Sequence, residues 1–206
     1  MEHEHSPAQP PREMSSARLE GFSDGVLAVI ITIMVLELRP PGGDNLAALR
    51  SLIPGLLIYV LSFTFIGIYW NNHHHLLRAT RRISGGVMWA NLHLLFWLSL
   101  VPAVTAWIGA YPRSRWPAVT FGAIGFLAGL AYFILALTIR AVNKDTRLNA
   151  RLQRDTKQWV SLALYLLGMG LAFIEPLLAF GAYALVSIMW FVPDRRFVKS
   201  GDGQDR

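Results

Sequence analysis

The stretch RLEGFSDGVLAVIITIMVLEL, residues 18–38, decides the fold class of this chain. It opens with charged and polar residues, becomes almost wholly apolar after Asp24, and ends before a Pro-Pro pair. Its length matches the roughly 20 residues that an α-helix needs to cross the hydrocarbon core of a bilayer. Val29, Ile33 and Leu36 follow i, i+4, i+7 spacing, so on a helix they share one narrow stripe. We interpret this stretch as a first membrane-spanning helix whose stripe faces an ion pathway. The alternative, more common for such a stripe, is that it faces lipid or the core of the bundle.

The composition of the whole chain agrees with a membrane protein. The chain has 206 residues, of which 53% are hydrophobic and only 16% are charged, and the charged residues cluster between long apolar segments. A soluble domain of this length would need a more polar surface. The fold class expected is therefore an all-α integral membrane protein, with the lipid bilayer as its surroundings.

The excess of basic residues does not indicate a nucleic-acid partner. The formal net charge is +6, but Lys and Arg lie at the ends of apolar segments, where membrane orientation signals belong. The chain has no cysteine, which excludes a disulfide framework and a thiol-ligated metal site. Charge and cysteine usage therefore leave the membrane interpretation unchanged.

Further apolar segments suit membrane-spanning helices at residues 51–77, 87–108 and 118–142. The last apolar region, residues 159–192, carries Glu175 and a following proline at its middle. Two alternatives remain open for this region. The pair marks a tight turn between two short spans, or it kinks one span and leaves Glu175 inside the membrane.

The distribution of positive charge favours the turn. With the N-terminus in the cytoplasm and six spans, all but four of the 19 Lys and Arg residues lie on the cytoplasmic side. With five spans, eight of the 19 lie outside. The positive-inside rule thus predicts six spans with both termini cytoplasmic. The expected organisation is a disordered tail over 1–15, a six-helix membrane domain over 16–194 and a cytoplasmic tail over 195–206.

A cluster of histidines ends the second span. Three adjacent histidines on one helix point about 100° apart, so they cannot all bind one metal ion. Trp70, His73 and His74 stand at i, i+3 and i+4 and share a face, from which they can hydrogen-bond to a neighbouring helix. Asn91 and His93 on the third span are candidate partners. We expect an interhelical network here and no metal site.

The polar start of the first span has two interpretations. Ser23 or Asp24 can cap the helix by accepting hydrogen bonds from free backbone N–H groups. Alternatively, Arg18 and Asp24 take part in a short network at the cytoplasmic mouth, because a carboxylate near lipid needs partners. Thr32 most simply bonds to a carbonyl one turn back.

Motifs of other membrane proteins and of enzymes are absent from the sequence. It contains no TVGYG carbonyl filter, and no HExxH, Walker A or GxSxG pattern. The histidine cluster is the only feature that would support a membrane enzyme. We therefore expect a protein that is not an enzyme.

The pattern RxxxFSDG at residues 18–25, followed by AVIITIMVLEL at residues 28–38, resembles the signature of the transmembrane protein 175 family. This is the lysosomal potassium-channel family with its prokaryotic relatives. The similarity extends to WxxHH at residues 70–74, to Asn91 and to Pro102. The six-span layout covers nearly the whole chain.

The resemblance implies six helices per subunit and a homotetramer, with a non-classical four-fold pore lined by the first helix. Matching positions make Val29 the main constriction, Ile33 and Leu36 further hydrophobic rings, and Thr32 a contributor to potassium preference. The family often has isoleucine where this chain has Val29, so the ring here should gate less tightly. The signature residues that would form the network holding the pore helix are Arg18, Phe22, Ser23, Asp24, Trp70, His73, His74 and Asn91.

The expected function is passive conduction of potassium through this constriction, with protons as a further candidate ion. It implies no cofactor, no nucleic-acid partner and a location in the plasma membrane. The alternative is a secondary transporter or proton-coupled carrier that uses Asp24 or Glu175. No convincing internal repeat, which many such carriers have, is present.

Overall fold

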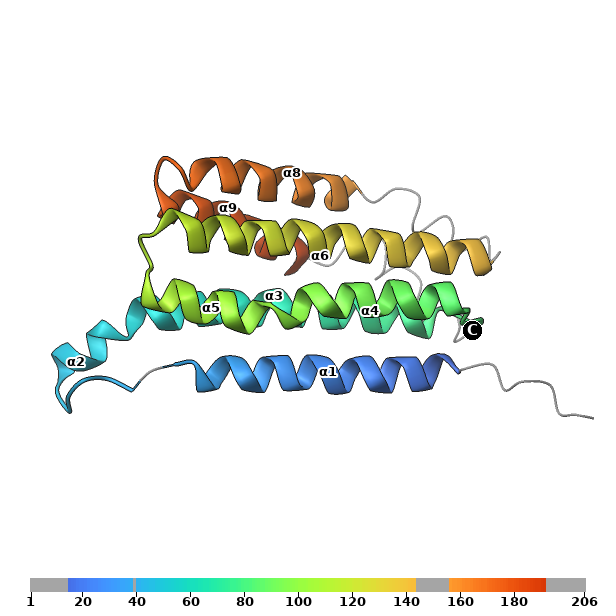
Figure 1. Ribbon diagram of the computed structural model, residues 1–206, viewed down its shortest axis with the longest axis horizontal. Helices are drawn as coiled ribbons and strands as arrows, with labels where there is room; N and C mark the ends of the chain where they lie inside the picture. The colour runs from blue at the N-terminus through green and yellow to red at the C-terminus, as the bar shows by residue number, and fades with distance from the viewer. Residues whose placement is uncertain (1–14, 39, 144–155, 192–206) are drawn as a thin grey trace, which may run out of the picture.

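The computed structural model describes residues 15–38, 40–143 and 156–191, and their regular structure is entirely helical. Most of the two expected tails, and residues 144–155, lie outside the described residues. The helices run roughly side by side in one elongated bundle (Figure 1). Their bounds are α1 Ser16–Leu36, α2 Leu46–Ser51, α3 Ile53–Arg78, α4 Gly85–Ser99, α5 Val101–Ala110, α6 Arg115–Val142, α8 Thr156–Leu171 and α9 Pro176–Phe191.

Four helical segments are long and apolar enough to cross a membrane. They are Ser16–Leu36, Ile53–Arg78, Gly85–Ala110 and Arg115–Val142. Each lies within a few residues of a span expected from hydropathy. Exposed tryptophans stand near both ends of the third segment, Trp89 and Trp107, as interfacial anchoring requires. These features describe a multi-pass membrane protein.

The third segment is broken into α4 and α5 beside Pro102. Proline has no backbone N–H, so the hydrogen bond to the carbonyl four residues earlier is missing. The helix C-cap falls at Leu100, and α5 begins at Val101 with the proline in its first turn. The two helices still follow one line in the bundle (Figure 1).

The last apolar region forms two antiparallel helices, α8 and α9, of 16 residues each. Glu175 lies exposed in the turn between them, where its backbone N–H donates to the carbonyl of Leu171 at 2.9 Å. The turn predicted from charge distribution is therefore present. Glu175 does not lie within a continuous helix.

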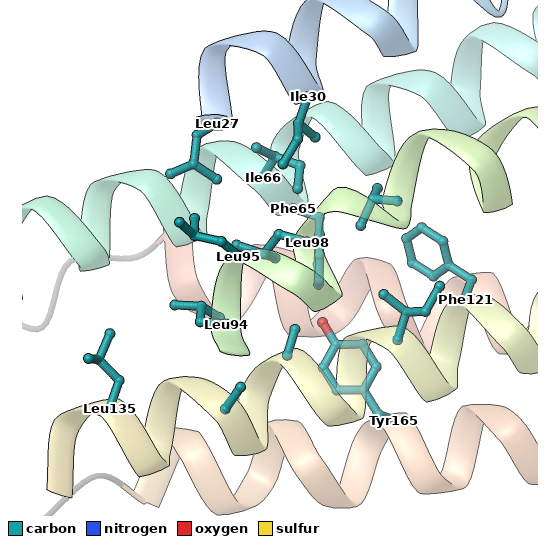
Figure 2. Close-up of a cluster of buried hydrophobic side chains, with 14 of the residues drawn as sticks. Leu27, Ile30, Phe65, Ile66, Leu94, Leu95, Leu98, Phe121, Leu135 and Tyr165 are labelled. Atoms are coloured by element: carbon teal, nitrogen blue, oxygen red, sulfur yellow. The ribbon is translucent and has the colours of Figure 1, made fainter. Parts of the chain in front are cut away.

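The bundle is built in layers, with α1 at one side and α8 at the other (Figure 1). α1 contacts α3, α4 and α5; α6 joins α4 to α8, and α9 fills the space against α3, α6 and α8. Fully buried aliphatic side chains such as Leu94 and Leu135 occupy the centre (Figure 2). α1 is thus supported on one face only, which determines where its other face points.

Glycines allow α6 and α8 to approach large aromatic rings. A Cβ at Gly125 of α6 would lie 2.5 Å from Cε1 of Tyr165, and one at Gly122 would collide with the hydroxyl of Tyr183. Small residues of this kind permit close helix approach in membranes. On α8, Gly168 faces the ring of Tyr183 in the same way, whereas nothing lies within 4 Å of a Cβ at Gly170.

This contrast gives a matched pair of stability tests. We expect Gly168→Ala to lower the free energy of unfolding by about 1–3 kcal/mol, because the new methyl group overlaps the Tyr183 ring. Gly170→Ala should be neutral or stabilising by roughly 0.5–1 kcal/mol, since alanine restricts the unfolded chain. Thermal unfolding in detergent, followed by size-exclusion chromatography, measures both. Equal shifts in the two variants would show that the close contact does not matter.

Candidate pore face and supporting network

α1 has two faces of different exposure. Leu27, Ile30 and Met34 are each at most 4% exposed and pack into the bundle. Val29 and Ile33 are 55% and 42% exposed. At 100° per residue the centres of these two sets are about 110° apart around the helix, so the sets lie on different faces. Leu36, at 80% exposure, continues the outward stripe.

The outward stripe borders an open groove between α1 and the junction of α4 and α5. Residues from both sides line this groove, among them Gly25, Val29 and Ile33 from α1 and Ser99, Pro102 and Ala103 from the junction. Phe22 also lines it and is 53% exposed. Most of the lining is apolar or small, so this surface suits another helix or lipid rather than water.

Thr32 lies beside the stripe on the exposed side of α1. Its hydroxyl donates to the carbonyl of Val29 at 2.9 Å, the bond to the preceding turn expected from the sequence. This bond fixes the hydroxyl hydrogen and leaves the oxygen lone pairs as acceptors.

A buried hydrogen-bond chain joins three helices. Ser23 of α1 donates to the Leu19 carbonyl at 2.8 Å and accepts from Nδ2 of Asn91 at 2.9 Å. Oδ1 of Asn91 lies 2.6 Å from Nε2 of His73 on α3. Since Oδ1 can only accept, Nε2 of His73 carries the proton. All three side chains are at most 1% exposed, and they tie α1, α4 and α3 together.

A second pair of contacts joins α1 to α3 at the edge of this chain. The indole N–H of Trp70 donates to Oδ1 of Asp24 at 3.0 Å. Nδ1 of His74 lies 2.6 Å from Oε1 of Glu20, and the Trp70 and His74 rings stack with centroids 6.0 Å apart. Glu20 and Asp24 are four residues apart on α1, as Trp70 and His74 are on α3. The equal spacing on the two helices therefore allows both pairs, Asp24 with Trp70 and Glu20 with His74, to form side by side.

Six of the eight predicted network residues are brought together, and two are not. Arg18 is exposed, and its side chain forms no hydrogen bond or ion pair with any residue that the structure describes. Phe22 lies on the outward face of α1. His93 also points away, where its Nε2 accepts from the Trp97 indole at 2.9 Å. The capping interpretation of Ser23 and Asp24 is wrong, because α1 begins at Ser16.

The three histidines diverge as helix geometry requires. His73 points into the bundle, His74 toward Glu20, and His75 is exposed. Within the described ranges, no three His, Cys, Asp or Glu side chains are grouped so that they could hold a metal ion.

Two contacting residues were missed by sequence reasoning. Glu20 was overlooked, although its i, i+4 spacing from Asp24 repeats the Trp70–His74 spacing. Asn143, after α6, accepts from the backbone N–H groups of Arg81 and Arg82 at 3.1 and 2.9 Å. Nothing local in the sequence marks this second contact.

Comparison with known proteins gives consistent similarities. The family model described as endosomal/lysosomal potassium channel TMEM175 matches residues 18–102. A potassium channel of Chryseobacterium sp. (strain P1-3) is 45% identical over 188 residues, covering 91% of this chain and 98% of that protein. A potassium channel of Streptomyces collinus is 33% identical, covering 85% and 91% of the respective chains.

Animal proteins and a solved structure extend the similarity. The bovine endosomal/lysosomal proton channel TMEM175 is 29% identical over 141 residues, which cover 61% of this chain and 29% of that protein. The crystal structure of a lysosomal potassium-selective channel TMEM175 homologue from Chamaesiphon minutus superposes with a TM-score of 0.76 at 27% identity. It covers 86% of this chain and 96% of that one.

Proposed function

The chain belongs to the TMEM175 family, a family of channels rather than enzymes, and from this premise we propose that it forms a potassium-permeable cation channel. Bacterial relatives of nearly the same length carry the name potassium channel. The animal relatives carry the name proton channel, so protons are a second candidate ion.

The exposed stripe of α1 is the observation that carries this proposal. Val29 and Ile33 project away from their own bundle, so an assembly of copies could bring them to a common axis. In a homotetramer, Val29, Ile33 and Leu36 would form three successive rings. With a rise of 1.5 Å per residue, the rings span about 10 Å along the axis. A narrow apolar passage of this kind excludes water and so blocks a hydrated cation without any charged gate.

We propose that the supporting network holds α1 in a fixed rotation about its own axis. The buried chain of Ser23, Asn91 and His73 links the inner face of α1 to α4 and α3. The contacts of Trp70 with Asp24 and of His74 with Glu20 add a second attachment. Opening would require rotation or spreading of α1, which these contacts oppose.

Six spans with both termini in the cytoplasm of a plasma-membrane protein fit the same proposal. Ser16 at the start of α1 donates to the Leu77 carbonyl near the end of α3, and Asn143 after α6 binds the backbone of Arg81 and Arg82. These helix ends therefore share one end of the bundle, and basic residues gather there. By the positive-inside rule, this clustering of positive charge supports a cytoplasmic location for that end.

A carrier is the competing function, with Asp24 or Glu175 as its coupling carboxylate. Glu175 lies in the exposed turn at the end of α8, which is not the mid-membrane position that carriers use. Asp24 is held by Trp70 at the edge of the α1–α3 contact. The channel is thus the better supported of the two.

Recordings from the purified protein in planar bilayers test both the function and the role of Thr32. We expect discrete unitary potassium currents. With potassium on one side of the bilayer and sodium on the other, we expect Thr32→Val to shift the reversal potential toward zero. The reason is that valine keeps the shape of threonine but removes the hydroxyl oxygen that a dehydrated cation can use. Saturable flux without unitary steps would favour the carrier, and an unchanged reversal potential would remove Thr32 from the selectivity proposal.

A further inference from the structure

A small, partly open cavity lies inside the subunit, away from the face of α1. It lies among α3, α6, α8 and α9, its volume is about 40 Å³, and apolar and polar side chains both line it. Its polar lining includes Tyr69, Asn72, Gln158, Ser161, Tyr165 and Ser187. Polar groups such as these are costly within a membrane-spanning bundle when they lack hydrogen-bond partners, because lipid offers none.

Two tyrosine hydroxyls at this cavity have no hydrogen-bond partner within the described ranges. Tyr165 is 3% exposed, and neither its hydroxyl nor that of Tyr69 forms a hydrogen bond with any residue that the structure describes. Figure 2 shows Tyr165 extending from α8 toward the interior, with its oxygen at the inner end of the ring. The Tyr69 hydroxyl lies where Gly129 leaves space, 3.6 Å from the position of an added Cβ.

The remaining polar groups offer acceptors to these two donors. Gln158 donates through Nε2 to the Gly129 carbonyl at 2.6 Å, and Asn72 donates through Nδ2 to the Ile68 carbonyl at 2.8 Å. Ser187 donates to the Tyr183 carbonyl at 3.3 Å. Because each bond uses a side-chain hydrogen, each side chain keeps oxygen lone pairs. The cavity therefore combines unpaired donors with available acceptors.

We propose that this cavity is an internal hydration site in which water joins α8 and α9 to α3 and α6. Water can accept from the two phenols and donate to the amide and hydroxyl oxygens at the same time. A volume of about 40 Å³ gives room for about two or three water molecules, each of which needs roughly three polar partners. The described residues that line the cavity include no carboxylate, which favours neutral water over a cation. The proposal does not depend on the pore.

X-ray radiolytic footprinting of the purified, full-length oligomer tests the proposal. Radicals formed from bound water label adjacent side chains even when bulk solvent cannot reach them. Tyr183 is the matched control, because it is 1% exposed and its hydroxyl donates directly to the Ala118 carbonyl at 3.1 Å. We expect Tyr165 to be labelled several-fold faster than Tyr183. Equal slow labelling would mean a dry cavity and would overturn the proposal.

A pair of variants at Ser187 distinguishes the effect of filling the cavity from the effect of removing the serine hydroxyl. Ser187→Val occupies part of the cavity and should reduce labelling of Tyr165 to the rate of Tyr183. Ser187→Ala leaves the space open and should keep the fast labelling. The assignment of water to this cavity would be contradicted if both variants lost the fast labelling of Tyr165, or if both kept it.

A density map of the wild-type oligomer gives a readout that needs no variant. Two or three separate peaks within hydrogen-bond distance of Tyr69 and Tyr165 are the expected result. An acyl chain or empty volume would overturn the proposal. So would an anomalous signal in the cavity of crystals grown with rubidium in place of potassium, since it would identify a cation site.

Discussion

Replacing Ile33 by asparagine should increase the potassium current at rest at least about tenfold, since lowering a barrier by about 1.4 kcal/mol is enough for that factor. Ile33 is 42% exposed on the outward face of α1, at the middle of the proposed rings. In a symmetric assembly, every subunit would contribute one carboxamide to the same ring. Water would then fill the narrow passage and lower the cost of ion entry. Macroscopic current per purified oligomer, measured in proteoliposomes or planar bilayers, is the readout.

A substitution on the far side of the bundle controls for general leakage. Leu166 of α8 is 54% exposed, and α8 lies at the opposite side of the bundle from α1 (Figure 1). Leu166→Asn introduces the same polar group at similar exposure and should leave the current unchanged. An equal rise in both variants would indicate damage to the bilayer or the fold rather than a wetted pore.

Asn91→Leu should cause the largest loss of stability among substitutions in the network. It deprives Nε2 of His73 of its acceptor and removes the donor to Ser23, and all three side chains are buried. Each buried polar group left without a partner costs about 1–3 kcal/mol. Such a loss is a large share of the typical stability of a domain, which is about 5–15 kcal/mol. Thermal unfolding of the detergent-solubilised oligomer measures it.

Two comparisons separate the network from ordinary packing. His93 is exposed on α4, the helix that carries Asn91, and its side chain accepts a hydrogen bond from Trp97 of that helix. His93→Leu should therefore shift the unfolding temperature little. His73→Leu combined with Asn91→Leu removes both partners and should cost less than the sum of the single changes. A larger effect of His93→Leu, or strict additivity in the double variant, would show that the buried chain is not a coupled unit.

The membrane-spanning helices could be predicted from the sequence because length and hydropathy determine them directly. The region around Glu175 and its proline could not be decided by hydropathy. A kinked span and a tight turn have the same composition there, and packing of α8 against α9 selects the turn. Charge distribution pointed to the same result, because the number of membrane crossings determines on which side of the membrane the positively charged C-terminal segment lies.

The prediction of the network succeeded where side chains are three or four residues apart. It failed elsewhere because other spacings place side chains on different faces of a helix. Trp70, His73 and His74 share a face and meet α1 and α4 as their spacing indicated. Arg18 and Asp24 are six residues apart, which places them about 120° apart around the helix. His93, two residues after Asn91, is rotated by about 200° and points to the other side.

The direction of the α1 stripe could not be obtained from its spacing. A set of apolar residues at i, i+4 and i+7 is equally compatible with the core, with lipid and with a pore. Burial in the structure excludes the core, because Val29, Ile33 and Leu36 are exposed, whereas a different face of α1 carries the buried residues Leu27, Ile30 and Met34 into the bundle. The choice between lipid and pore depends on neighbouring subunits.

The most direct test is chemical access to Val29 in the assembled protein. The natural chain has no cysteine, so Val29→Cys creates a single thiol per subunit. Silver ions are small enough to follow a cation pathway and bind thiolate tightly. We predict irreversible block of the potassium current by silver in Val29→Cys and no block in Leu166→Cys. An unaffected current in Val29→Cys, with the thiol modified as shown by mass spectrometry, would place Val29 outside the pathway and contradict the pore proposal.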